Sequence, residues 1–208
     1  MTVRVVGPRT EHYYRDAHWQ AKHGITSIIN TTSKGGWSSD FSPFKLGPCR
    51  VKPFSSYEES LVMENAWQYS KVYAQHLDSK GCLRKGRWLQ WAKEGWHNPK
   101  AVRYPMGRGA KPEYSLWNGS ALSYVEARKK IYIPLYAKLV VATEGFKKLQ
   151  RLYKSEETIV LWDFDGYDHV REKKTLEQVV NNPFKKMGHA FVLAMLLERH
   201  PIVQKYLR

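Results

Sequence analysis

An apolar stretch that runs directly into acidic residues, ETIVLWDFDG, constrains the fold of this chain more than any other segment. Its β-branched and large apolar side chains predict a buried strand, and Gly166 predicts a turn after it. A second β-branched stretch, residues 25–32, also predicts a strand. Helical patterns are more numerous and cover residues 10–22, roughly 56–76, 121–141 with a bend near Pro134, 143–155, 175–181 and 185–199. Residues 77–120 predict mainly loops. The sequence therefore predicts an α+β fold, mostly α, with a small sheet surrounded by helices.

Length and composition bound the class of protein. A chain of 208 residues, 42% of them apolar, is long enough for one sizeable core, so we expect a single domain over residues 1–208. No run approaches the roughly 20 apolar residues of a membrane span, and the N-terminus lacks a signal-peptide core; we expect a soluble, cytoplasmic protein without membrane contact. Only Cys49 and Cys82 occur, so neither a disulfide framework nor a zinc site is expected, and no metal or cofactor is predicted.

The strong positive charge points to an anionic partner. The chain carries 34 Lys and Arg against 19 Asp and Glu, a net charge of +15. The basic residues are spread along the sequence, which favours a basic face on a folded domain over a disordered basic arm. Nucleic acid or a phosphate-bearing ligand is therefore the expected partner, and the alternative is that the charge only keeps the protein in solution.

The stretch VMENAWQYSKVY, residues 62–73, has the periodicity of an amphipathic helix. On such a helix Glu64, Gln68 and Lys71 lie on one side, and Trp67 flanks them. A polar stripe with apolar shoulders is typical of a cleft wall in which a carboxylate is partly desolvated, which makes Glu64 a candidate catalytic residue. The alternative is an ordinary solvated helix face.

A pair of carboxylates follows the predicted strand in VLWDFDGYDH. Asp163 and Asp165 stand at its carboxyl end, where catalytic side chains are often presented on a rigid sheet. One alternative is simple turn formation, because Asp before Gly is a common turn sequence. Another is a site for a hard metal ion built from these two residues and Asp168.

Two segments carry candidate anion-binding groups. In YPMGRGAKPEYSLWNG, Gly107 and Gly109 allow Arg108 to approach a phosphate, and Trp117 offers a stacking surface. The alternative for this segment is a flexible surface loop. Near the C-terminus His189 stands in the first turn of a predicted helix that also holds lysines, although a single histidine at such a place is more often structural.

Taken in order, these segments resemble the NADAR (YbiA-like) family of N-glycosidases. The family's helix motif E-x-x-x-Q-x-x-K matches ENAWQYSK at Glu64, Gln68 and Lys71. SDFSPFKL, EARKKIYIPLY, WDFDGYDH and FKKMGHAFVLAMLL are similar to its other segments, so the likeness covers residues 38–199, and residues 1–37 form an N-terminal extension of a helix and a strand. The resemblance implies the fold and the hydrolysis of an N-glycosidic bond. It also implies substrate contacts for side chains in the matched segments: Phe44, Trp67, Gln68, Trp117, Arg128 and His189.

Hydrolysis of an N-glycosidic bond passes through an oxocarbenium-like state, which needs a carboxylate and groups that help the base to leave. Under this resemblance Glu64 is expected to face the anomeric carbon. Asp163 or Asp165 is expected to handle water or the leaving base, as two carboxylates in different surroundings can divide these roles. Lys71 and Arg108 are expected to hold phosphate.

The charge favours a polynucleotide over a free nucleotide as substrate, because each neutralised phosphate releases counterions. We therefore expect a DNA glycosylase-like enzyme that cuts the bond between a modified base and deoxyribose and leaves an abasic site. A role in defence against phages with modified bases would fit this activity. The alternatives are removal of ADP-ribose from DNA bases, hydrolysis of a small ribosylamino-pyrimidine phosphate, and a non-catalytic nucleic-acid-binding module.

Overall fold

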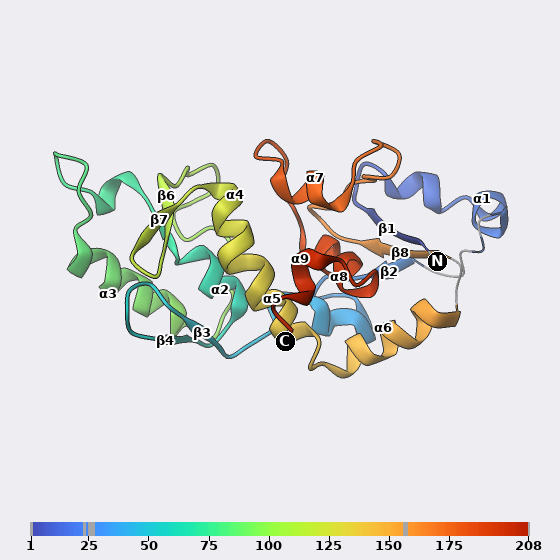
Figure 1. The fold of residues 1–208 in the computed structure, drawn as a ribbon, viewed down its shortest axis with the longest axis horizontal. Helices are drawn as coiled ribbons and strands as arrows, with labels where there is room; N and C mark the ends of the chain where they lie inside the picture. Colours follow the sequence, from blue (N-terminus) through green and yellow to red (C-terminus); the bar gives the residue numbers. More distant parts are fainter. Residues whose placement is uncertain (1, 23, 25–27, 156–157, 208) are drawn as a thin grey trace. The chain divides into compact units, whose positions relative to one another are not determined.

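The computed structural model describes residues 2–22, 24, 28–155 and 158–207 (Figure 1). The fold is α+β, with 42% helix and 15% strand in small sheets among helices, which confirms the predicted class. The chain divides into two compact units: unit 1 comprises Met1–Ser42 and Tyr136–Arg208, and unit 2 comprises Pro43–Leu135. The single domain over residues 1–208 stays a prediction. Across the described ranges no helix is both long and apolar enough to cross a membrane.

Unit 1 is built on a three-stranded parallel sheet with β8 in the centre. The strand order is β1-β8-β2, formed by Thr2–Val6, Thr158–Trp162 and Ile28–Asn30. Ile159, Val160 and Leu161 are all buried, as expected for a parallel strand covered on both faces. The strand predicted from VLW is thus confirmed. The strand predicted over residues 25–32 is found over 28–30, and residues 25–27 lie outside the described ranges; β1 was not anticipated.

The helices of unit 1 pack on this sheet: α8 lies against β1, and α6 lies against β8. Every residue of α8 is buried, and it begins only after Gly188, whose extended backbone starts the helix later than the predicted residue 185. The predicted helix over residues 10–22 is interrupted, because the Asp16 side chain accepts a hydrogen bond from the Trp19 N–H at 2.6 Å and starts a new helix. The helical elements are η1 (Glu11–Tyr14), α1 (Ala17–Lys22), η2 (Gly36–Phe41), α6 (Glu144–Ser155), α7 (Leu176–Asn181), α8 (His189–Leu197) and α9 (Pro201–Gln204).

Unit 2 combines two small antiparallel sheets with short helices. One sheet pairs β3 with β4, and the other has the order β5-β6-β7. Helix α3 packs against α2, β4 and η3. The elements are β3 (Cys49–Val51), β4 (Glu58–Ser60), α2 (Met63–Gln68), β5 (Lys71–Val72), η3 (Ala74–His76), α3 (Lys85–Trp96), β6 (Tyr114–Trp117), β7 (Ser120–Leu122) and α4 (Tyr124–Ala127).

The long helix predicted over residues 56–76 is wrong. Within it only α2 is α-helical, with β4 before it and β5 after it, and the range ends in the short 3-10 helix η3. Lys71 and Val72 pair with Ser115 and Tyr114 across an antiparallel ladder. These partners come from more than forty positions further along the chain. Tertiary pairing of this kind overrides a local helical period.

The loop-rich reading of residues 77–120 is also wrong in part, because α3 forms there. Its Trp88 and Trp96 are 0% and 1% exposed, so both indoles belong to the core. A Cβ atom at Gly95 would lie 2.1 Å from the ring of Tyr69, and glycine is therefore required where this ring lies against the helix. These buried indoles offer no stacking surface.

The helix predicted over residues 121–141 forms as three consecutive pieces. Helix α4 starts at a capping box in which the Ser123 N–H donates to Glu126 at 3.0 Å, a π-helical segment η4 spans Arg128–Tyr132, and α5 spans Ile133–Val140. The widened η4 turn lies just before Pro134, whose ring removes a helical donor and crowds the preceding turn. The boundary between the two units falls within α5.

Candidate functional site

The motif residues of unit 2 form a hydrogen-bonded chain. Glu64 and Gln68 stand four residues apart on α2, which places their side chains side by side. Gln68 Nε2 donates to Glu64 Oε1 at 2.8 Å. Lys71 Nζ donates to Gln68 Oε1 at 2.5 Å from strand β5. We call these three side chains the Glu64 relay.

The chemistry of Lys71 fixes the direction of the relay. An ammonium group only donates, so the carbonyl oxygen of the Gln68 amide must face Lys71. The NH₂ group of the same amide must then face Glu64, whose Oε1 acts as acceptor. Because Glu64 and Gln68 are only 6% and 7% exposed, this carboxylate is held in a largely desolvated setting.

The backbone under the relay is anchored by groups distant in sequence. The first N–H groups of α2 donate to the loop before β3, with Met63 bonded to Leu46 at 2.8 Å and Glu64 bonded to Pro43 at 3.0 Å. The fully buried Asn65 accepts from the Val102 N–H at 2.8 Å and donates to two carbonyl groups of the same loop. Sequence analysis missed Asn65, whose role depends on residues more than thirty positions away.

Aromatic rings and two cations, Lys71 and Arg128, lie around Trp67, which stands between Glu64 and Gln68 in the sequence of α2. Lys71 Nζ lies 5.1 Å from the centre of the Trp67 ring, and the Tyr132 ring lies 5.2 Å from it. The guanidinium carbon of Arg128, which is 2% exposed, lies 4.6 Å from the centre of the Tyr124 ring. Tyr124, Arg128 and Tyr132 are spaced by four, a period from which the sequence would have revealed the two missed tyrosines.

The remaining residues of unit 2 that were predicted to bind substrate differ in their exposure to solvent. Phe44 follows Pro43 in the loop that anchors α2, and 38% of its surface is exposed. Trp117 packs against the cluster of Leu122, Ala127 and Ile131. Arg108 is exposed, 5.8 Å from the centre of the Tyr104 ring, between glycines with positive φ. The substrate contacts of all three stay predictions.

In unit 1 Asp163 and His189 lie in contact. His189 Nδ1 is 3.1 Å from Asp163 Oδ2, and His189 Nε2 is 2.8 Å from the carbonyl oxygen of Thr31. The Ala190 N–H also donates to Asp163 Oδ2, at 3.1 Å. Both side chains are buried. Asp163 therefore joins the end of β8 to the start of α8, and His189 joins both to the residue that follows β2.

Gly188 makes this contact sterically feasible. A Cβ atom at this position would lie 2.1 Å from Asp163 Oδ2, which no side chain tolerates. Nothing local in the sequence identifies Asp163 as the neighbour of this glycine.

The other acidic residues of this region have separate partners. The Asp165 N–H donates to Asp163 Oδ1 at 3.3 Å, and Lys186 Nζ lies 4.0 Å from Asp165 Oδ1. Asp168 is buried and accepts hydrogen bonds from the Tyr14 hydroxyl and the Arg171 N–H. Burial and the bond to Asp168 raise the pKa of Tyr14 far above its usual value. In the part of the chain that the structure describes, no three His, Cys, Asp or Glu side chains are grouped to hold a metal ion.

Comparisons with protein-family models, curated proteins and solved structures find no match to this chain.

Proposed function

We propose that the protein is an N-glycosidase that acts on nucleic acid, with Glu64 as its catalytic carboxylate. The observation that carries the proposal is the Glu64 relay, in which a buried carboxylate is oriented by an amide that a cation holds in turn. The resemblance of ENAWQYSK to the NADAR motif supports the same assignment, because the motif residues are the relay.

The relay suits the chemistry of glycosidic cleavage. A carboxylate beside the anomeric carbon stabilises the positive charge that develops on the sugar, or activates the attacking water. Gln68 is a positioning residue, because its N–H fixes one oxygen of Glu64. A carboxylate that is oriented before the reaction and shielded from water stabilises a nearby developing cation more strongly than a solvated one does.

Exposed aromatic rings paired with cations support nucleic acid as the substrate class. Tyr57 is 57% exposed, with Arg50 5.1 Å and Lys52 5.2 Å from the centre of its ring. Tyr104 is 40% exposed beside Arg108. Rings on which bases stack, next to cations that meet phosphates, are typical of surfaces that bind single strands. The net charge of +15 adds to this preference.

The role of the second carboxylate stays a prediction. Asp163 accepts hydrogen bonds from the Ala190 and Asp165 N–H groups within unit 1, and His189 Nδ1 lies 3.1 Å from its Oδ2; these contacts support the start of α8. Asp165 is partly exposed, and Lys186 Nζ lies 4.0 Å from its Oδ1. The proposal therefore stands on Glu64 alone.

The test is to incubate the protein with plasmid and phage DNAs that differ in base modification, and then to probe for alkali-labile abasic sites. We expect strand breaks on at least one modified DNA with the wild type and with Glu59→Gln, an exposed control, and none with Glu64→Gln. Release of free ADP-ribose from ADP-ribosylated DNA would identify that alternative bond as the target. Hydrolysis of only a ribosylamino-pyrimidine phosphate would select the small substrate. If no substrate is cut while wild type and Glu64→Gln bind DNA equally, the protein is a binding module and the proposal fails.

A further inference from the structure

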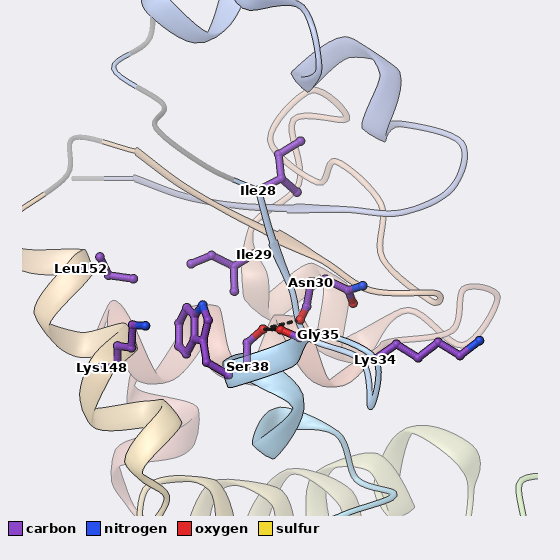
Figure 2. Close-up of a pocket in the computed structure, with 9 residues that line it drawn as sticks. Ile28, Ile29, Asn30, Lys34, Gly35, Ser38, Lys148 and Leu152 are labelled. Atoms are coloured by element: carbon purple, nitrogen blue, oxygen red, sulfur yellow. Dashed lines mark hydrogen bonds between the residues drawn. The ribbon is translucent and has the colours of Figure 1, made fainter.

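A cavity of about 450 Å³ opens in unit 1 between β2, η2 and α6. Figure 2 shows Lys148 and Leu152 on α6 across from Ile29 on β2. Ile28 adds to the apolar wall, and Trp37 contributes an indole that is 39% exposed. None of its lining residues belongs to the Glu64 relay. Cavities of roughly 300–1,000 Å³ with an apolar wall and a few polar groups are typical of small-ligand sites.

The charged residues that line the cavity favour an anionic ligand. Its lining includes Lys34 and Lys148 and no acidic residue. Lys148 Nζ lies 4.3 Å from the centre of the Trp37 ring. On the same helix Lys147 is paired with Glu144 at 2.6 Å, whereas Lys148 faces the indole. A lysine ammonium over an aromatic ring can meet a phosphate while the ring meets a base.

The polar groups of the wall are held in place by backbone contacts. Ser38 Oγ bonds to the carbonyl oxygens of Asn30 and Gly35 at 2.6 and 2.8 Å, as the dashed lines of Figure 2 show. Asn30 Oδ1 accepts from the Thr32 N–H at 3.0 Å, which fixes the orientation of its amide.

Close packing sets the distance between the two walls. A Cβ atom at Gly145 would lie 3.2 Å from the Phe41 ring and 3.3 Å from the carbonyl oxygen of Trp37. Glycine thus lets α6 approach η2. This packing holds the indole of Trp37 on η2 close to Lys148 on α6, so one ligand can contact both side chains.

We infer that this cavity binds a nucleoside monophosphate group, with the base against Trp37 and the apolar wall and the phosphate on Lys148. The group can come from a free nucleotide or from one nucleotide of a single strand, since both present the same base and phosphate. The inference goes beyond the proposed function, because it requires binding and no cleavage.

The test is calorimetric titration of the full chain carrying Glu64→Gln, which blocks turnover at the proposed catalytic carboxylate. The probes are adenosine 5′-monophosphate, adenosine, ribose 5-phosphate and a five-nucleotide deoxyadenosine strand. We expect the monophosphate to bind about tenfold more tightly than adenosine or ribose 5-phosphate, because only it engages both groups. Preference for the free nucleotide or for the strand identifies the source of the group.

Matched variants decide whether the cavity is the binding site. Lys148→Gln is expected to weaken binding of the monophosphate about tenfold, while Lys147→Gln, with the same charge change on the same helix, alters it less than about twofold. Trp37→Ala is expected to weaken binding by a similar factor, with its fold checked by thermal melting. Equal losses in both lysine variants, or no loss in Lys148→Gln, would overturn the inference. Because turnover is not measured, failure of the glycosidase proposal leaves this result intact.

Discussion

Glu64 in unit 2 and Asp163 in unit 1 are both buried carboxylates that accept hydrogen bonds, yet their partners differ in kind. Glu64 is held by the side chain of Gln68, and through it by Lys71. Asp163 is held by backbone N–H groups and by His189 at the start of a buried helix. Backbone donors from separate elements make a carboxylate part of the fold. The side-chain amide of Gln68, one turn along the same helix, instead orients the carboxylate of Glu64.

Burial alone does not single out the proposed catalytic carboxylate. Both carboxylates are less than 10% exposed. The two carboxylates differ in the expected effect of their removal. Loss of Asp163 should lower the stability of the fold, and loss of Glu64 should lower turnover. Variants at the two positions therefore test whether the two carboxylates differ in this way.

The largest expected effect is the loss of turnover in Glu64→Gln. The amide retains the size of the side chain and an oxygen that can accept from Gln68, but it removes the negative charge that the proposed mechanism places beside the sugar. We expect the cleavage rate to fall by about 10³-fold. The melting temperature should stay within about 2 °C of the wild type. A marked fall in melting temperature with retained cleavage would make Glu64 structural.

The next largest effect is the loss of stability in Asp163→Ala. The change removes the acceptor of the Ala190 N–H and leaves His189 buried without its carboxylate. Breaking a buried pair of this kind costs about 3 kcal/mol. Urea unfolding measures it, and Asp165→Ala, at a partly exposed neighbour, should cost less than about 1 kcal/mol. Similar stability of the two variants would mean that Asp163 is not the structural member of the comparison.

The fold was predictable where a pattern is local and uninterrupted. Strand β8 and helices α6 and α7 follow from apolar runs and periods that no distant contact alters. The helix predicted over residues 56–76 failed because β5 is defined by its pairing with β6, which a local pattern does not contain. Helix α3 was missed because its glycines, Gly86 and Gly95, lower the local helix signal, while Gly95 is required for packing against Tyr69.

The residues of the candidate site were easier to predict from the sequence than their arrangement in space. The spacing of Glu64, Gln68 and Lys71 suggested one helix face, whereas Lys71 reaches Gln68 from a strand. The supports of the site were not predictable. Asn65 bonds to a loop that only the tertiary fold brings near, and Gly188 matters only because Asp163 lies against it. Short-range spacing can show which residues belong to the site, but it contains no information about contacts between residues that are distant in the sequence.

A smaller effect is expected when the support of Glu64 is removed. Gln68→Ala leaves the carboxylate in place but frees its orientation, so kcat should fall by about 10- to 100-fold with little change in KM. The matched control is Gln75→Ala, since Gln75 is exposed and lies outside the relay. Steady-state kinetics measures both. A rise in KM without a change in kcat would show that Gln68 binds substrate and does not position Glu64.

The smallest expected effect is a pH dependence of stability that distinguishes the two units. Burial lowers the pKa of His169 in unit 1, with the charge of Asp168 acting in the opposite direction, and burial together with Arg87 lowers the pKa of His76 in unit 2. A lowered folded-state pKa means that the unfolded chain binds more protons below its ordinary pKa of about 6.5. Stability should therefore be complete above that pH and fall as the pH decreases below it towards the lowered folded-state pKa.

Urea unfolding of His169→Gln and His76→Gln between pH 7.5 and 5 measures these contributions. Each variant should flatten the pH dependence. If one cooperative transition is observed, both variants alter its single midpoint, as the prediction of one domain over residues 1–208 requires. If two transitions are resolved, His169→Gln should alter one and His76→Gln the other, and that prediction is then wrong. Either result tells whether the two buried carboxylates share one cooperative structure, because each belongs to the same unit as one of these histidines.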